Sequence, residues 1–296
     1  MGADYHDRST RSATRRPLIT GTPASQATKA QLTEPTSRPT RQEETAAQFS
    51  EHAAGFASAA AHFSAESLKL IGELASVAHY KLAIDVATGP GFTAFEVAPY
   101  CDLVIATDPA EGMLEQVRRI AKERGLDNVE ALAAYADALP VDDAAADLIT
   151  CRTAPHHFPS VTDFLDEVAR AVKPGGTFIL ADTSAPEDDD LDAWMNDMEQ
   201  RRDRTHVRDL KHSEWRALLA EAGFNQNFEA TTHVHMKVRD WSARTGVSDT
   251  DLEAIIDTWR NAPEPVIEAF QINRAEGPRE DYSFSWPVFV TRTTKT

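Results

Sequence analysis

The chain has 296 residues, 42% of them hydrophobic, which is enough to bury the core of one large domain. Its formal net charge is −17, divided between +4 on residues 1–42 and −21 on residues 43–296. Because an acidic body repels phosphate groups, nucleic acid is disfavoured as the main partner. A small molecule is expected instead.

The two cysteines, Cys101 and Cys151, cannot form a disulfide framework and offer no paired zinc-ligand spacing, so no metal site is expected. No run approaches the roughly 18 consecutive apolar residues of a membrane span. The N-terminus also lacks the apolar segment of a secretory signal. These absences predict a cytoplasmic protein without a membrane span, while nothing in the sequence indicates the oligomeric state.

Residues 1–42 are rich in Ser, Thr, Pro and Arg and poor in apolar residues, so they are predicted to be a disordered tail. The remainder, 43–296, is predicted to form one domain. It begins with a helix-forming stretch, 43–78, interpreted as a helical lid. Within that lid, Phe49, Phe56 and His62 are candidates to close over a bound cofactor and exclude water.

From residue 82 onward, short apolar runs alternate with helical patterns. The apolar runs are 82–86, 103–106, 129–132, 148–151 and 178–181, and the helical patterns are 92–98, 110–124 and 161–172. This alternation predicts an α/β fold whose mostly parallel sheet is covered by helices on both faces. Gly125 and Gly175 are placed to end two of the helices.

After residue 182 the alternation breaks down. Residues 185–210 are charged and partly helical, Ser213 is predicted to cap a helix, and 228–238 reads as a strand. A second helical insert at 240–270 precedes a final strand at 282–291. We interpret the two inserts, 185–210 and 240–270, as caps over a substrate site.

The most informative motif is an apolar strand that leads through Asp85-x-x-x-Gly89-x-Gly91 into a helix. The two glycines allow a sharp turn and a close approach of the backbone to a ligand at the carboxyl ends of the strands. The pattern also fits the dinucleotide fingerprint, so an NAD-dependent oxidoreductase is an alternative. Asp85 would lie unfavourably close to a pyrophosphate but favourably close to the ammonium and sulfonium groups of S-adenosylmethionine (SAM).

Two further acids follow the next two strands. Asp108 can accept hydrogen bonds from both hydroxyls of a ribose, or it can cap the helix that follows Pro109. Asp137 can accept a hydrogen bond from an adenine amino group, or it can be an ordinary turn residue.

Together with Ala136-Asp137-Ala138 and the Lys-Pro-Gly-Gly run ending at Gly176, these motifs resemble the class I SAM-dependent methyltransferases. The resemblance covers about residues 45–224, and it is strongest to the small-molecule branch that includes the ubiquinone and menaquinone biosynthetic enzymes. It implies a three-layer, Rossmann-like, seven-stranded sheet whose last strand is antiparallel. It also implies a SAM site that contains Asp85, Thr88, Gly89, Gly91, Asp108, Pro109, Asp137, Ala138 and Arg152.

Residues 151–158 look like the family's fourth motif, which borders both the methyl donor and the acceptor. This segment departs from the corresponding segment of the quinone enzymes, which argues against a quinone acceptor. His156 and His157 are the candidate general bases, because an imidazole titrates near neutral pH. Arg152 is a candidate for holding an anionic substrate or the SAM carboxylate.

The sequence therefore predicts methyl transfer from SAM to a small molecule of unidentified structure. Besides the NAD-dependent oxidoreductase, a SAM- or nucleotide-binding regulatory protein without turnover is an alternative, because the motifs concern binding and a fold does not establish a reaction.

Overall fold

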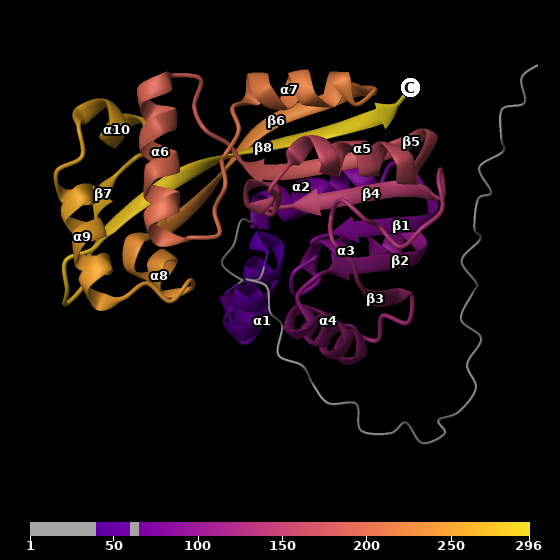
Figure 1. Cartoon of the computed structure of the whole chain (residues 1–296), viewed down its shortest axis with the longest axis horizontal. Coiled ribbons are helices and arrows are strands. Elements are labelled where there is room, and N and C mark those ends of the chain that lie inside the picture. The colour runs from indigo at the N-terminus through magenta and orange to yellow at the C-terminus, as the bar shows by residue number, and fades with distance from the viewer. Residues whose placement is uncertain (1–39, 60–64) are drawn as a thin grey trace, which may run out of the picture. The chain divides into compact units, whose positions relative to one another are not determined.

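The computed structural model describes residues 40–59 and 65–296 (Figure 1). The predicted tail lies outside these ranges except for residues 40–42, where helix α1 (Arg41–Ala59) begins. The lid candidate His62 also lies outside the described residues. Helix α2 (Ala65–Ala75) follows, so the predicted helical stretch contains two helices.

A single sheet organises the described part of the chain, in the order β3-β2-β1-β4-β5-β8-β6. Strands β1 to β5 pair in parallel, whereas β8 runs antiparallel to both β5 and β6. A two-residue strand, β7, pairs with β8 outside this path. The predicted Rossmann-like, mostly parallel sheet with an antiparallel last strand is confirmed, and the short β7 is an eighth strand beyond the seven that were predicted. The strands are β1 (Tyr80–Val86), β2 (Cys101–Asp108), β3 (Val129–Ala133), β4 (Ala146–Arg152), β5 (Val172–Thr183), β6 (Phe224–Lys237), β7 (Asn273–Arg274) and β8 (Tyr282–Lys295).

The central strands are apolar throughout because helices cover both faces of the sheet. Neighbouring residues of one strand join different cores, as Ala83 and Ile84 of β1 do. Figure 1 shows the helices on the two sides of the sheet. They include α3 (Phe92–Val97), α4 (Glu111–Arg124), α5 (Val161–Ala171) and α7 (His212–Glu221).

The two predicted cap inserts form a helical subdomain around the extended ends of β6 and β8 (Figure 1). Its core holds the buried side chains of Trp241, Trp259 and Trp286, with the ring centroids of Trp259 and Trp286 5.7 Å apart. Its helices are α6 (Asp189–Arg202), α8 (Val238–Ala243), α9 (Asp249–Arg260) and α10 (Glu264–Ala269). Over the described ranges, no helix combines the length and the apolar character that crossing a bilayer requires.

One of the two glycine predictions is correct and the other is wrong. Gly125 ends α4 with a left-handed φ of 66°. Gly175, in contrast, lies within β5, because α5 already ends at Ala171 and the chain enters the sheet at the next residue. Gly175 has a φ of 74° and lies in the irregular stretch of β5 between Val172 and Thr177, two residues that pair with β4.

The prediction that Ser213 caps a helix is also wrong. Helix α7 begins at His212 with Lys211 at the N-cap position, so Ser213 lies inside the first turn. Its backbone N–H and its hydroxyl both donate to the Glu187 carboxylate, at 2.9 and 2.7 Å. The hydroxyl therefore ties the cap segment to α7 and does not start the helix.

The turn after β1 depends on two glycines that have different surroundings. Gly91 has a φ of 94°, and a Cβ built on it would lie 2.6 Å from Cζ of Phe95 and 3.1 Å from Cγ2 of Val117. Gly89 has a φ of 54°, but a Cβ there would meet no atom within 4 Å. Only Gly91 is required for packing.

We expect Gly91→Ala to lower the free energy of unfolding by about 2–3 kcal/mol, because the left-handed backbone and the clash with Phe95 both penalise the methyl group. Gly89→Ala, which has the first penalty without the second, should cost about 1 kcal/mol. Urea unfolding of both variants measures the difference. Equal losses would show that the contact with Phe95 is not the cause.

Candidate functional site

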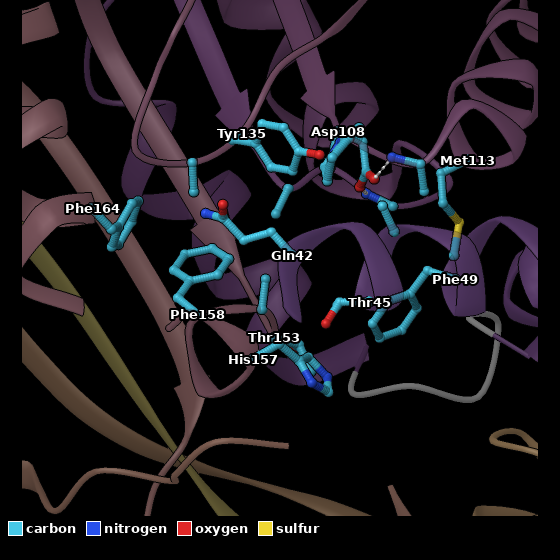
Figure 2. Close-up of a pocket in the computed structure, with 18 of the residues that line it drawn as sticks. Gln42, Thr45, Phe49, Asp108, Met113, Tyr135, Thr153, His157, Phe158 and Phe164 are labelled. Atoms are coloured by element: carbon cyan, nitrogen blue, oxygen red, sulfur yellow. Dashed lines mark hydrogen bonds between the residues drawn. The ribbon is translucent and has the colours of Figure 1, made fainter. Parts of the chain in front are cut away.

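A cavity lies at the carboxyl ends of β1, β2 and β4 and is closed on one side by α1. Figure 2 shows Asp108 and Tyr135 at one end of this cavity and His157 at the other. Most of the residues predicted for the site line it, namely Thr88, Gly89, Asp108, Pro109, Asp137, Arg152 and His157. The predicted residues Asp85, Gly91, Ala138 and His156 do not line it. We call it the first cavity.

Asp85 lies behind the glycine turn and not in the cavity wall. Its buried carboxylate accepts hydrogen bonds from the hydroxyl of Thr150 at 2.6 Å, the N–H of Ala94 at 3.1 Å and the hydroxyl of Thr88. Burial raises the pKa of Asp85 to about 6, although the two hydroxyl hydrogen bonds oppose the rise. Asp85 was expected to lie close to a bound cation, but here its direct contacts hold the turn in place.

Asp108 reaches from the end of β2 across to the same turn. Its carboxylate accepts hydrogen bonds from the N–H groups of Gly89 and Ala110, both at 2.9 Å. Burial raises its pKa to about 6 against the effect of these hydrogen bonds. Because a carboxylate offers about four acceptor positions, two remain for a ligand. Helix α4 begins with Ala110 at its N-cap, so Asp108 does not take that position.

The loop after β3 brings Tyr135, Ala136 and Asp137 to the first cavity, whereas Ala138 is exposed and outside its wall. The carboxylate of Asp137 accepts a hydrogen bond from the side chain of Gln42 at 3.0 Å. The loop that carries the sequence motif therefore borders the cavity. It also supplies an aromatic side chain, Tyr135, two positions before Asp137.

Arg152 and Thr153 lie at the end of β4 and line both the first cavity and a second one beside it. Nε of Arg152 donates to the hydroxyl of Thr93 at 3.0 Å. Thr153 has a φ of 54°, which is unusual for a β-branched residue, and Ala87 in the glycine turn has a φ of 49°. Strained residues of this kind cluster at functional sites.

His156 is buried and held in an ion pair. Its Nδ1 lies 2.7 Å from Oδ1 of Asp182, and its backbone N–H donates to Oδ2 of the same carboxylate at 3.0 Å. Burial alone would lower the pKa of His156, but the charge and hydrogen bond of Asp182, together with Asp209, raise it to about 9. An imidazole that is already protonated at neutral pH cannot serve as a base, which argues against that hypothesis for His156.

His157 is in the opposite electrostatic situation. Burial and the neighbouring charge of His156 lower its pKa well below the ordinary value, so it is neutral. Its Nδ1 lies 3.2 Å from the hydroxyl of Thr205, which donates its only proton to Oδ1 of Asp203 at 2.7 Å. Nδ1 must therefore be the donor in the contact with Thr205. This tautomer leaves Nε2 as an acceptor.

The second cavity shares Phe49, Phe56, Arg152, Thr153 and His157 with the first. Its opposite wall belongs to the cap and to the ends of β6 and β8, with apolar side chains that include Trp241 and Trp286. His157 thus stands between the two cavities, with a ring-to-ring contact to Phe49 at 5.0 Å between centroids.

The residues of the first cavity that were not predicted from the sequence include Gln42 and Thr45 of α1 and Met113 of α4 (Figure 2). Phe49 and Phe56, the lid candidates of α1, also line it. No local motif marks Gln42 or Thr45, because their place depends on how α1 packs against α4. In the described part of the chain, no group of three or more His, Cys, Asp or Glu side chains is arranged to hold a metal ion.

Comparison with known proteins identifies related chains. Residues 84–180 match the family model described as a methyltransferase domain. An uncharacterized methyltransferase, YcgJ of Bacillus subtilis, is 32% identical over 207 residues, which cover 70% of this chain and 82% of that protein. The crystal structure of YcgJ superimposes with a TM-score of 0.70, covering 77% of this chain and 97% of that one at 30% identity. The demethylmenaquinone methyltransferase of Clavibacter sepedonicus is 36% identical over 103 residues, 35% of this chain and 41% of that protein.

The buried carboxylate of Asp108 makes a testable contribution to stability. Because its pKa is about 6 in the folded protein and 3.8 in the reference state, folding favours the protonated form and this contribution is lost as the pH rises through 4 to 6. Asp108→Asn removes the effect. Its stability relative to the unaltered protein should therefore increase between pH 4 and 7, by up to about 3 kcal/mol.

Urea unfolding at several pH values measures this difference, with Asp142→Asn, an exposed acid, as the matched control. A difference between Asp108→Asn and the unaltered protein that stays constant with pH would show that Asp108 is not penalised by burial.

Proposed function

The chain belongs to the class I SAM-dependent methyltransferases, and from this premise we propose that it methylates a small molecule held in the second cavity. The family supports methyl transfer from SAM, whereas the acceptor is inferred from the site. The observation that carries the proposal is the pair of adjoining cavities with a neutral His157 between them. An enclosed cavity of this kind suits a small molecule better than a polymer.

The first cavity fits SAM in the chemistry of its lining. The open space at Gly89 lets a ligand approach the backbone, and Asp108 keeps two acceptor positions for the ribose hydroxyls. Tyr135 and Asp137 would border the adenine, and the guanidinium of Arg152 would hold the carboxylate of SAM. When bound, SAM supplies a methyl group on a sulfonium, which is already a good leaving group.

The residues around the cavities can position the acceptor and exclude water. Phe49 and Phe56 of α1 line both cavities, where their apolar rings would help to exclude water from the transfer. Nε2 of His157 can accept the proton that the nucleophilic atom of the acceptor must lose. Thr205 and Asp203 orient the imidazole ring for that step by fixing its Nδ1–H tautomer.

Isothermal titration with SAM and with S-adenosylhomocysteine tests the proposal. We expect both to bind, and Asp108→Ala to weaken binding by roughly 10–100-fold, because two hydrogen bonds to a charged group are lost. Asp142→Ala is the matched control and should bind like the unaltered protein.

Other results of ligand-binding experiments would favour a different function. Protection against heat unfolding by NADH and not by SAM would overturn it in favour of an oxidoreductase. Binding of SAM without methylation of any acceptor in a broad screen would favour a regulatory protein.

The state of His157 can be measured directly through its imidazole ¹⁵N chemical shifts. We expect a neutral ring with the proton on Nδ1 throughout the range from pH 5.5 to 8, because burial and the charge of His156 lower its pKa. Comparison with His157→Gln assigns the signals. An Nε2–H tautomer, or a ring that is protonated near neutral pH, would rule out the base role.

A further inference from the structure

The second cavity has a wall that indicates the chemistry of the acceptor. We propose that it binds a neutral molecule with a flat apolar body and one hydroxyl group, and that this hydroxyl donates an anchoring hydrogen bond to Asp203, separate from the atom whose proton passes to His157. This proposal rests on the proposed function and specifies its acceptor. It combines three observations, which concern the apolar wall, the unpartnered oxygen of Asp203 and the balance of charge.

The apolar wall is formed by the cap and the last two long strands. Val234 and Met236 come from β6, Trp286 and Val288 from β8, and Trp241 from α8. The polar atom of Trp286 is already used, because its Nε1 donates to Oε1 of Glu199 at 2.6 Å. What remains for a ligand on this side is indole and aliphatic surface, which suits a flat apolar body.

The carboxylate of Asp203 is satisfied on one oxygen and unsatisfied on the other. Oδ1 accepts hydrogen bonds from the N–H of Thr205 at 2.9 Å, the hydroxyl of Thr205 at 2.7 Å and the side chain of Gln48 at 3.0 Å. Oδ2 is buried and accepts no hydrogen bond from the described residues. The nearest cationic atom, Nη1 of Arg202, is 3.9 Å away. A buried carboxylate oxygen without a partner is costly, and a donor on a ligand removes that cost.

The other polar groups of this wall already have partners among the described residues. The hydroxyl of Thr183 donates to Asp209, and Glu199 accepts from Arg202 as well as from Trp286. His156 is paired with Asp182. Besides Nε2 of His157, which the transfer step uses, Oδ2 of Asp203 is the anionic acceptor of this lining that remains for a donor on the ligand.

Charge on the wall argues for a neutral ligand. Arg152, Arg202 and the protonated His156 supply three positive charges. The acids of the lining are Glu199 and Asp203, and His156 is compensated from behind by Asp182 at 2.7 Å and Asp209 at 3.9 Å. The positive charges are therefore already opposed by acids, and an anionic ligand would also meet Asp203 directly.

Three ligands of one size separate these features. The protein is first saturated with S-adenosylhomocysteine and then titrated calorimetrically with p-cresol, with 4-methylanisole, which lacks the donor, or with 4-methylbenzoate, which is anionic. We expect p-cresol to bind about tenfold more tightly than either of the others, as the loss of one hydrogen bond to a charged group predicts. Equal affinity for p-cresol and 4-methylanisole, preference for 4-methylbenzoate, or no binding of any of the three would overturn the proposal.

Asp203→Asn tests the residue, because an amide can keep the contacts of Oδ1 while presenting N–H groups where Oδ2 was. This variant should lose the preference for p-cresol over 4-methylanisole. Asp197→Asn, an exposed acid of helix α6, at whose C-cap Asp203 lies, is the matched control and should keep it. A preference that survives in Asp203→Asn would remove Asp203 from the proposal.

The design separates this inference from the proposed function. Binding of S-adenosylhomocysteine is measured before the second ligand is added, so its failure counts against the methyltransferase site and not against the acceptor chemistry. The unfolding midpoint of Asp203→Asn is also recorded. If that variant does not fold, the ranking of the three ligands on the unaltered protein still decides the question.

Discussion

A single buried carboxylate, that of Asp85, holds together the elements on which the site depends. It lies next to the last residue of β1 and accepts hydrogen bonds from Thr88 in the glycine turn, Ala94 in α3 and Thr150 in β4. Three donors on three elements offset much of the cost of burying the acid. Because the turn is fixed in this way, the N–H of Gly89 meets Asp108, and both face the first cavity.

The sequence predicted the strands and the cavity residues best where their position depends on residues close to them along the chain. The apolar runs predicted the strands, and the acids after β2 and β3 were placed at the cavity because parallel strands end at one edge. Local signals failed at Gly175 and Ser213. Gly175 has the left-handed φ expected of it, but within an irregular stretch of β5, and the hydroxyl of Ser213 donates to the distant Glu187.

The chemistry of His157 could not have been read from the sequence. Its tautomer depends on Thr205 and Asp203, which approach it only because the cap folds over the end of β4. The adjacent residue, His156, has the same side chain but contacts Asp182, and it takes the opposite charge state. Two consecutive histidines are therefore distinguished by distant partners and by the effect of the His156 charge on His157.

Helix α1 forms hydrogen bonds with one residue beside each cavity. Gln42 donates to Asp137 beside the first cavity, and Gln48 donates to Asp203 beside the second. Arg41 adds a hydrogen bond to the carbonyl of His206 at 2.8 Å. Displacement of α1 would therefore remove the apolar cover of Phe49 and Phe56 and, in the same movement, a donor from the Asp203 carboxylate. The enclosure of the first cavity and the electrostatics of the second thus depend on one helix.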